Sequence, residues 1–403
     1  MKFFKDLSIV TKIIIGLLLG ALLGLWANHA RVGYLNIISI FGTLYIGSLK
    51  AIAPLLVFVL VIDSLSSGKS SDKQSKGIKK VILLYFISSF ASALLAVVAS
   101  FMFKVTMPGL EAAGGSVNNP DLYANIMTML ESIVSNPIAA IVEGNYLPIL
   151  FWAVLIGLCM KNIGTDTTKV FLHDLSEAIT AVIQLIISFA PLGVMGLVFE
   201  AVSTNGVSIF VDYGKLIALL SVTLCLVIFV INPLIVAICL RKNPYPLVFE
   251  CLVKSGTNAF FTRSSAANIP INIGLCKEMN LDKEIYSVTI PLGATINMAG
   301  AAVVITIMSL STAWTLGLNI SFAYALVMCF IATIAAAGTA GTAGGSLMLI
   351  PLACSLFGIS QDLAWYTVGV GGTIGVIQDS LETAVNSSSD VLLTATANMM
   401  LNK

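Results

Sequence analysis

Charged residues are scarce in this chain. They make up 10% of its 403 residues, against about 25% in an ordinary soluble domain, while hydrophobic residues make up 58%. A water-soluble protein could not cover its surface with so few charges, so the lipid bilayer must be the solvent for most of the surface. The net charge of +1 gives no indication that nucleic acid is a partner.

Histidines and paired cysteines are also scarce. The two histidines, His29 and His173, stand far apart in the chain, and none of the seven cysteines forms a CxxC pair. We therefore predict free cysteines that act as small apolar side chains, with neither a metal centre nor histidine-based catalysis. The protein is not expected to be an enzyme.

Long apolar segments are what the sequence has instead. Six of them, each long enough to cross a bilayer at ~1.5 Å per residue, lie near 8–28, 38–66, 78–107, 139–161, 176–203 and 212–240. The first follows Lys2 and Lys5 and is too long for the apolar core of a signal peptide. Lysines cluster before the first segment and after the second, so the positive-inside rule places the N-terminus in the cytoplasm. We expect a multi-pass protein of the inner (plasma) membrane with both termini cytoplasmic.

The second half of the chain contains two segments of small residues that do not read as plain spans. No charged residue occurs between 285 and 361, and all twelve residues of 335–346 are Ala, Gly, Thr or Ser. A similar segment covers 255–267. Glycine-rich backbone inside a membrane must be buried in protein or line a cavity, which favours two re-entrant hairpins and a binding site at the bilayer midplane. The alternative is close packing of helices through small residues.

The last apolar segment, about 363–397, carries acidic residues. Asp379, Glu382, Asn386 and Asp390 are spaced by three, four and four residues, which places them on one face of a helix. Ionised groups in a span are expensive and normally face a cavity or a cation. The alternative is a short amphipathic tail outside the membrane.

The segment 291–300 predicts a broken helix. It contains a proline, two glycines and an asparagine inside an otherwise apolar span. Unwound carbonyl groups together with a carboxylate can hold a hard cation such as sodium.

Four motifs together carry a resemblance to a known family: Pro291-Leu-Gly-Ala-Thr-Ile-Asn-Met298, Thr262-Arg-Ser-Ser265, Ala337-Gly-Thr-Ala-Gly341 and the final Asp379, Asn386 and Asp390. The chain resembles the dicarboxylate/amino acid:cation symporters, the glutamate-transporter family. Within it, the chain is most similar to the bacterial symporters of serine and threonine with sodium. The likeness covers nearly the whole chain and is strongest from 250 to 392.

The resemblance implies an all-α polytopic fold with eight transmembrane helices and two re-entrant hairpins, near 248–276 and 325–358. It implies inverted repeats and an elevator mechanism within a homotrimer. A scaffold part would comprise about 1–70 and 125–205. A transport part would comprise about 76–110 and 210–400.

The resemblance also implies site residues. Asp379 would hold the ammonium group of the substrate, and Ser264 and Ser265 would bind its α-carboxylate together with the backbone of 339–344. The implied substrate-binding set is Asp379, Glu382, Ser264, Ser265, Thr339, Ala340, Gly341, Ala301 and Asn386. A first sodium ion (Na+), which is co-transported, would bind Gly293, Asn297, Asn386 and Asp390. A second would bind Thr295, Met298, Ala336, Ala337 and Thr339. The third sodium site of the family would comprise Tyr85, Ser88, Ser89 and Asn297.

Departures from the family pattern refine the expected substrate and the ion count. Members that carry acidic substrates have an arginine where this chain has Glu382, and a threonine where it has Ala301. Glu382 would repel a second carboxylate but accept a hydrogen bond from a hydroxyl, so serine and threonine are the expected substrates. Ala299 replaces the aspartate that the family commonly has at the third sodium site, so we expect fewer than three sodium ions per substrate.

Three alternatives remain at this point. The nearest is a sodium- or proton-coupled symporter of dicarboxylates or acidic amino acids on the same fold, which residue 382 would discriminate. An ion channel could also use re-entrant loops, but it does not need a carboxylate that pairs with an ammonium group. An intramembrane enzyme would need a nucleophile and a base within reach of each other, and the sequence has no such pattern.

Overall fold

The computed structural model describes residues 9–30, 37–66, 74–107, 109–110, 131, 133–143, 146–205, 208–337 and 344–401. Helices dominate these residues, and no β-strand occurs among them. Three helical stretches are long and apolar enough to cross a bilayer: Lys76–Met102, Tyr213–Leu240 and Lys283–Thr315. The predicted all-α class is confirmed, and the chain is a multi-pass membrane protein.

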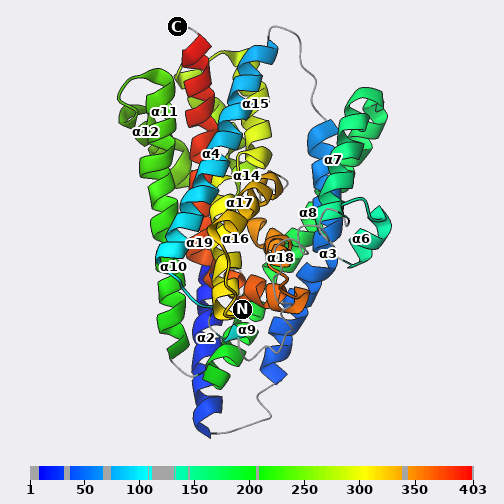
Figure 1. Ribbon diagram of the computed structural model, residues 1–403, viewed down its shortest axis with the longest axis vertical. Coiled ribbons are helices and arrows are strands. Elements are labelled where there is room, and N and C mark those ends of the chain that lie inside the picture. Colours follow the sequence, from blue (N-terminus) through cyan, green and yellow to red (C-terminus); the bar gives the residue numbers. More distant parts are fainter. Residues whose placement is uncertain are drawn as a thin grey trace, which may run out of the picture.

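One group of helices packs around α3 and α9, at the right and the bottom of Figure 1. Its members are α2 (Ile9–Ala30), α3 (Ser39–Ser66), α6 (Pro137–Glu143), α7 (Tyr146–Ile163), α8 (Asp166–Ser188) and α9 (Ala190–Asn205). A buried carboxylate links two of them, because Asp63 of α3 accepts a hydrogen bond from Ser176 Oγ of α8 at 2.8 Å.

Glycines allow α2 and α9 to lie in direct backbone contact. Gly16 and Gly20 face α9 so closely that a Cβ would lie 2.2 Å from Pro191 O and 2.4 Å from Met195 O, respectively. Gly24 continues the same face one turn later. Small residues at this spacing let helices approach closely where the lipid gives no hydrophobic driving force.

The other group surrounds α16 and α19 and fills the left and centre of Figure 1. Its first members are α4 (Gln74–Met102), α10 (Ser208–Leu226), the π-helix η3 (Val227–Ile231), α11 (Asn232–Leu240), α12 (Tyr245–Cys251), the π-helix η4 (Leu252–Gly256), α13 (Thr257–Thr262) and α14 (Ser265–Glu278). It continues with α15 (Lys283–Ile296), α16 (Ala299–Thr315), α17 (Phe322–Ala336), the 3₁₀ helix η5 (Ser346–Leu349), α18 (Ile350–Leu356) and α19 (Gln361–Leu401). Every residue of α16 up to Ala313 is buried, so this helix forms the core of the group.

Two predicted spans are divided in the structure. The expected span 139–161 is α6 followed by α7, and the expected span 176–203 is α8 followed by α9. The second division lies at Phe189, two residues before Pro191. Proline lacks an N–H group and cannot continue the hydrogen-bond ladder of α8, so the helix restarts there.

The first small-residue segment is a helical turn-back. α13 ends at Thr262, and the next residue, Arg263, has a left-handed backbone with φ of 51°. Ser264 then caps α14, because its side chain accepts a hydrogen bond from Ala267 N at 3.1 Å. We name α12 to α14 the first hairpin, and α17, η5 and α18 the second hairpin. Residues 338–343 of the second hairpin lie outside the described part of the chain.

Candidate functional site

Two carboxylates stand one turn apart on a buried face of α19. Asp379 and Glu382 are each 5% exposed, and Asn386 and Asp390 continue the same face at 3% and 0%. α19 runs through the centre of its group as one helix, so the alternative of a short tail outside the membrane is wrong. The predicted face of acidic residues is confirmed.

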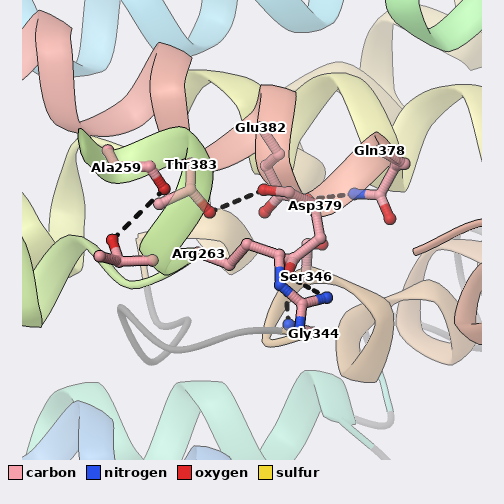
Figure 2. A network of polar contacts seen from close by, with 9 residues as sticks. Ala259, Arg263, Gly344, Ser346, Gln378, Asp379, Glu382 and Thr383 are labelled. Carbon is pink, nitrogen blue, oxygen red and sulfur yellow. Dashed lines mark hydrogen bonds and ion pairs between the residues drawn. The ribbon is translucent and has the colours of Figure 1, made fainter. Parts of the chain in front are cut away.

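Asp379 contacts both hairpins, through a hydrogen bond from one and an ion pair with the other. Its Oδ1 accepts a hydrogen bond from Gly344 N at 3.1 Å, and Arg263 Nη1 lies 3.7 Å from its Oδ2. Figure 2 shows Arg263 reaching toward Asp379 from the turn of the first hairpin, with Gly344 beside it. Arg263 itself is buried, so the ion pair is shielded from water.

Glu382 also accepts a hydrogen bond from the second hairpin. Its Oε2 receives hydrogen bonds from Ser346 Oγ at 2.7 Å and from Gln378 Nε2. Ser346 is the first residue of η5, and Gln378 lies one turn before Glu382 on α19 (Figure 2). Both donors are almost fully buried.

Arg263, Ser346 and Gln378 were not among the predicted site residues. Only Gln378 left a clear signal in the sequence, because a residue four positions before a glutamate on a helix shares its face. Arg263 and Ser346 stand inside the quoted small-residue segments, but their partners lie far away along the chain.

The first hairpin is fixed on α19 by asparagines. Asn268 Nδ2 donates to Ser387 Oγ at 2.7 Å, and Asn272 Nδ2 donates to Ser387 O at 3.1 Å. Ser264 acts as the cap of α14, and Ser265 is buried beside it. Contact of Ser264 and Ser265 with the substrate α-carboxylate stays a prediction.

The predicted break between α15 and α16 is present. α15 ends at Ile296, and α16 begins at Ala299. Asn386 bridges the break, because its Oδ1 accepts from Gly300 N at 2.7 Å and its Nδ2 donates to Met298 Sδ at 3.3 Å. Ala301 is fully buried in the first turn of α16.

A cluster of oxygen atoms lies beside this break. Asn297 Nδ2 donates to Asp390 Oδ1 at 2.8 Å, to Ser389 Oγ at 2.8 Å and to Asn386 O at 3.2 Å. The remaining oxygens, Asn297 Oδ1 and Asp390 Oδ2, are buried and accept no hydrogen bond from the described residues. Buried acceptors without donors are rare in native proteins and are a natural place for a hard cation.

Gly293 leaves the room for this cluster. A Cβ at this position would lie 2.6 Å from Asp390 Oδ1 and 2.9 Å from Tyr85 Oη. Tyr85 Oη in turn lies 3.2 Å from Asp390 O, to which it donates. The structure therefore brings together Gly293, Asn297, Asn386 and Asp390, the residues expected for the first sodium ion.

The structure describes only part of the residues predicted for the second and third sodium ions. Ser88 Oγ donates to Asn232 Oδ1 at 2.8 Å, whereas Ser89 Oγ is buried and has no hydrogen-bond partner within the described ranges. Thr295 and Met298 lie at the break, and Ala336 and Ala337 lie at the end of α17. The predictions for Thr339, Ala340 and Gly341 fall outside the described residues.

Sites that need several acidic, histidine or cysteine ligands are absent from the described residues. No group of three or more such side chains could hold a metal ion there. The cluster beside Asp390 offers a different set, namely carbonyl, amide and hydroxyl oxygens around one carboxylate.

Comparison with known proteins identifies the family. Residues 9–400 match the model of the sodium:dicarboxylate symporter family. The chain is 49% identical over 394 residues to the serine/threonine transporter SstT of Bifidobacterium adolescentis, covering 98% of this chain and 90% of that protein. It is 48% identical over 398 residues to the serine/threonine transporter SstT of Streptococcus agalactiae serotype III, covering 98% of this chain and 97% of that protein. The predicted resemblance is confirmed, and the chain belongs to the sodium:dicarboxylate symporter family, a family of transporters and not of enzymes.

Proposed function

We propose that this protein takes up serine and threonine across the inner membrane by cotransport with sodium ions. The observation that carries the proposal is the pair of buried carboxylates, Asp379 and Glu382, one turn apart on α19. An amino acid with a hydroxylated side chain offers two donor groups, its ammonium and its hydroxyl, and each would meet one carboxylate. The names of the relatives support the same substrates.

The substrate ammonium would compete with Arg263 for Asp379. The guanidinium lies 3.7 Å from the carboxylate and makes no hydrogen bond to Oδ2. An ammonium group in contact with the same oxygen would form a charge-assisted hydrogen bond, which is stronger than a longer ion pair.

Glu382 supports a neutral substrate side chain. Within the described residues it forms no ion pair, and its carboxyl group accepts hydrogen bonds only from Ser346 and Gln378. A substrate carboxylate placed beside it would be repelled in a site that contains little water. An acidic substrate would need Arg263 to leave Asp379 and bind the second carboxylate instead.

The first sodium ion would bind at the oxygen cluster of Gly293, Asn297, Asn386 and Asp390. The two buried oxygens without donors support this assignment. A second ion would bind at Thr295, Met298, Ala336, Ala337 and Thr339. The third site would lack a carboxylate, since Ala299 stands at the position that the family commonly fills with aspartate.

The proposed movement is an elevator with eight transmembrane helices and two hairpins. The division of the helices into two groups supports it, because packing is extensive within each group and sparse between them in the described residues. The group of α2, α3 and α6 to α9 would be the scaffold of a homotrimer, and the other group would carry the substrate. The lysines of the sequence support cytoplasmic termini.

The test is uptake of radiolabelled serine into proteoliposomes that have an inward sodium gradient, with unlabelled threonine and aspartate as competitors. We expect sodium-dependent accumulation that threonine blocks and aspartate does not. Blockage mainly by aspartate would favour the acidic-substrate alternative. Sodium flux without accumulation of serine would favour a channel.

A further inference from the structure

Both hydrogen bonds to Glu382 fall on one of its two oxygens. Ser346 Oγ and Gln378 Nε2 both donate to Oε2, while Oε1 accepts no hydrogen bond from the described part of the chain. One donor comes from the second hairpin and the other from α19 itself. The two contacts therefore fix the orientation of the carboxylate and leave its second oxygen available.

Gln378 contributes another available acceptor. Its Oε1 is buried and has no hydrogen-bond partner in the described ranges. When Glu382 is ionised, the opposite orientation of the amide would place Gln378 Oε1 against the carboxylate, where two acceptors would repel each other, so Nε2 is assigned as the donor to the carboxylate. A buried acceptor without a donor costs free energy, which a bound ligand that donates would recover.

We propose that Gln378 and Ser346 are positioning residues that make the site selective for the hydroxyl hydrogen of the substrate. By occupying Glu382 Oε2 they hold the carboxylate in place and leave two acceptor atoms, Glu382 Oε1 and Gln378 Oε1, without donors. This inference rests on the proposed function and deepens it, because it names the atom of serine and threonine that the protein recognises.

The arrangement ranks substrates by their side-chain donors. Serine and threonine each bring one hydroxyl that donates to an available acceptor. Alanine brings no donor and would leave both acceptors unsatisfied. An acidic side chain brings only acceptors and a negative charge. Sites built to bind a hydroxyl discriminate strongly against the analogue that lacks it, because their buried polar groups are then left unpaired.

A purely structural role for Ser346 predicts something different. The second hairpin contacts both carboxylates, because Gly344 N donates to Asp379 and Ser346 Oγ, two residues further along the chain, donates to Glu382. If Ser346 only held the hairpin against α19, its loss would weaken the binding of every substrate by the same factor. The ratio between serine and alanine separates these two roles.

The experiment measures KM for serine, alanine and sodium in proteoliposomes containing the wild type, Ser346→Ala and Gln378→Met. Methionine keeps the length of glutamine but donates no hydrogen bond. Ser355→Ala is the matched control, because Ser355 lies in α18 of the same hairpin and, among the described residues, its hydroxyl donates only to Leu352 O, at 2.7 Å. Ser346→Thr keeps the hydroxyl and tests for rescue.

We expect KM for serine to rise about tenfold in Ser346→Ala and Gln378→Met, the size of effect that follows from losing a hydrogen bond to a charged group. KM for alanine and for sodium should change by less than about twofold, and Ser355→Ala and Ser346→Thr should behave like the wild type. Equal changes for serine and alanine, or no change for either, would overturn the inference. Absence of serine uptake by the wild type would instead refute the proposed function.

Discussion

Arg263 Nη1 lies 3.7 Å from Asp379 Oδ2, so the turn of the first hairpin supplies a positive charge to the carboxylate that we expect to bind the substrate. Both side chains are buried, at 8% and 7% exposure. The residue that ends α13 in a left-handed conformation is thus also the counter-charge of α19.

Asp379→Asn should separate the structural and the functional parts of this pair. It leaves the guanidinium of Arg263 buried without a counter-charge, so we expect the free energy of unfolding to fall by about 3 kcal/mol and serine uptake to be lost. Adding Arg263→Gln should restore much of the thermal stability in detergent but not the uptake. Uptake by Asp379→Asn at the wild-type rate would show that the ammonium binds elsewhere.

Glu382→Gln should weaken the binding of serine and allow acidic amino acids to compete for the site. The amide accepts a weaker hydrogen bond than the carboxylate, so KM for serine should rise about tenfold. The repulsion of a second carboxylate is removed, so aspartate should inhibit serine uptake more strongly than it does in the wild type. Unchanged competition by aspartate would remove Glu382 from the explanation of selectivity.

Gly293→Ala should damage the cation site. Its Cβ would lie 2.6 Å from Asp390 Oδ1, which must then move. Displaced ligands and their supporting groups typically cost about 10- to 100-fold in ion affinity, so KM for sodium should rise by at least about tenfold. Gly274→Ala is the matched control, because an added Cβ there meets nothing within 4 Å. Equal sodium dependence of the two variants would argue against sodium at Asp390.

The number of sodium ions per serine should be below three. Serine is a zwitterion without net charge, so the charge moved per molecule of serine counts the ions directly. Parallel measurement of current and serine flux in proteoliposomes gives this ratio. A ratio of three would mean that the third site binds sodium without a carboxylate at Ala299.

Gly20→Ala should destabilise the contact between α2 and α9. The added Cβ would lie 2.4 Å from Met195 O, a backbone atom that cannot rotate away. Overpacking of this kind costs about 1–3 kcal/mol, which should appear as a lower melting temperature. Gly47→Ala on α3 is the control, since nothing lies within 4 Å of its Cβ. Equal melting temperatures would mean that the helices move apart at little cost.

Patterns within one helix predicted much of the site. The spacing of Asp379, Glu382, Asn386 and Asp390 predicted a shared face, and the structure buries all four on α19. Proline and glycine before Asn297 predicted the break between α15 and α16. Both signals are local, because helix periodicity and loss of a backbone donor act within a few residues.

Contacts between distant segments could not be predicted in the same way. Arg263 and Asp379 are 116 residues apart, and Ser346 and Glu382 are 36 apart. Which hairpin residue reaches which carboxylate depends on how the hairpins pack against α19, and no periodicity in the sequence records that. The π-helices η3 and η4 also left no signal in the composition of their segments.

The two carboxylates expected to meet the substrate have partners within the protein itself. Asp379 contacts Arg263 and Gly344, and Glu382 contacts Ser346 and Gln378. In a transporter with the proposed function, substrate binding at Asp379 exchanges one set of electrostatic contacts for another, and the net affinity is the difference between them. Such an exchange allows high selectivity for the substrate together with a modest affinity. That combination suits a carrier, because a substrate held too tightly would not be released on the other side of the membrane.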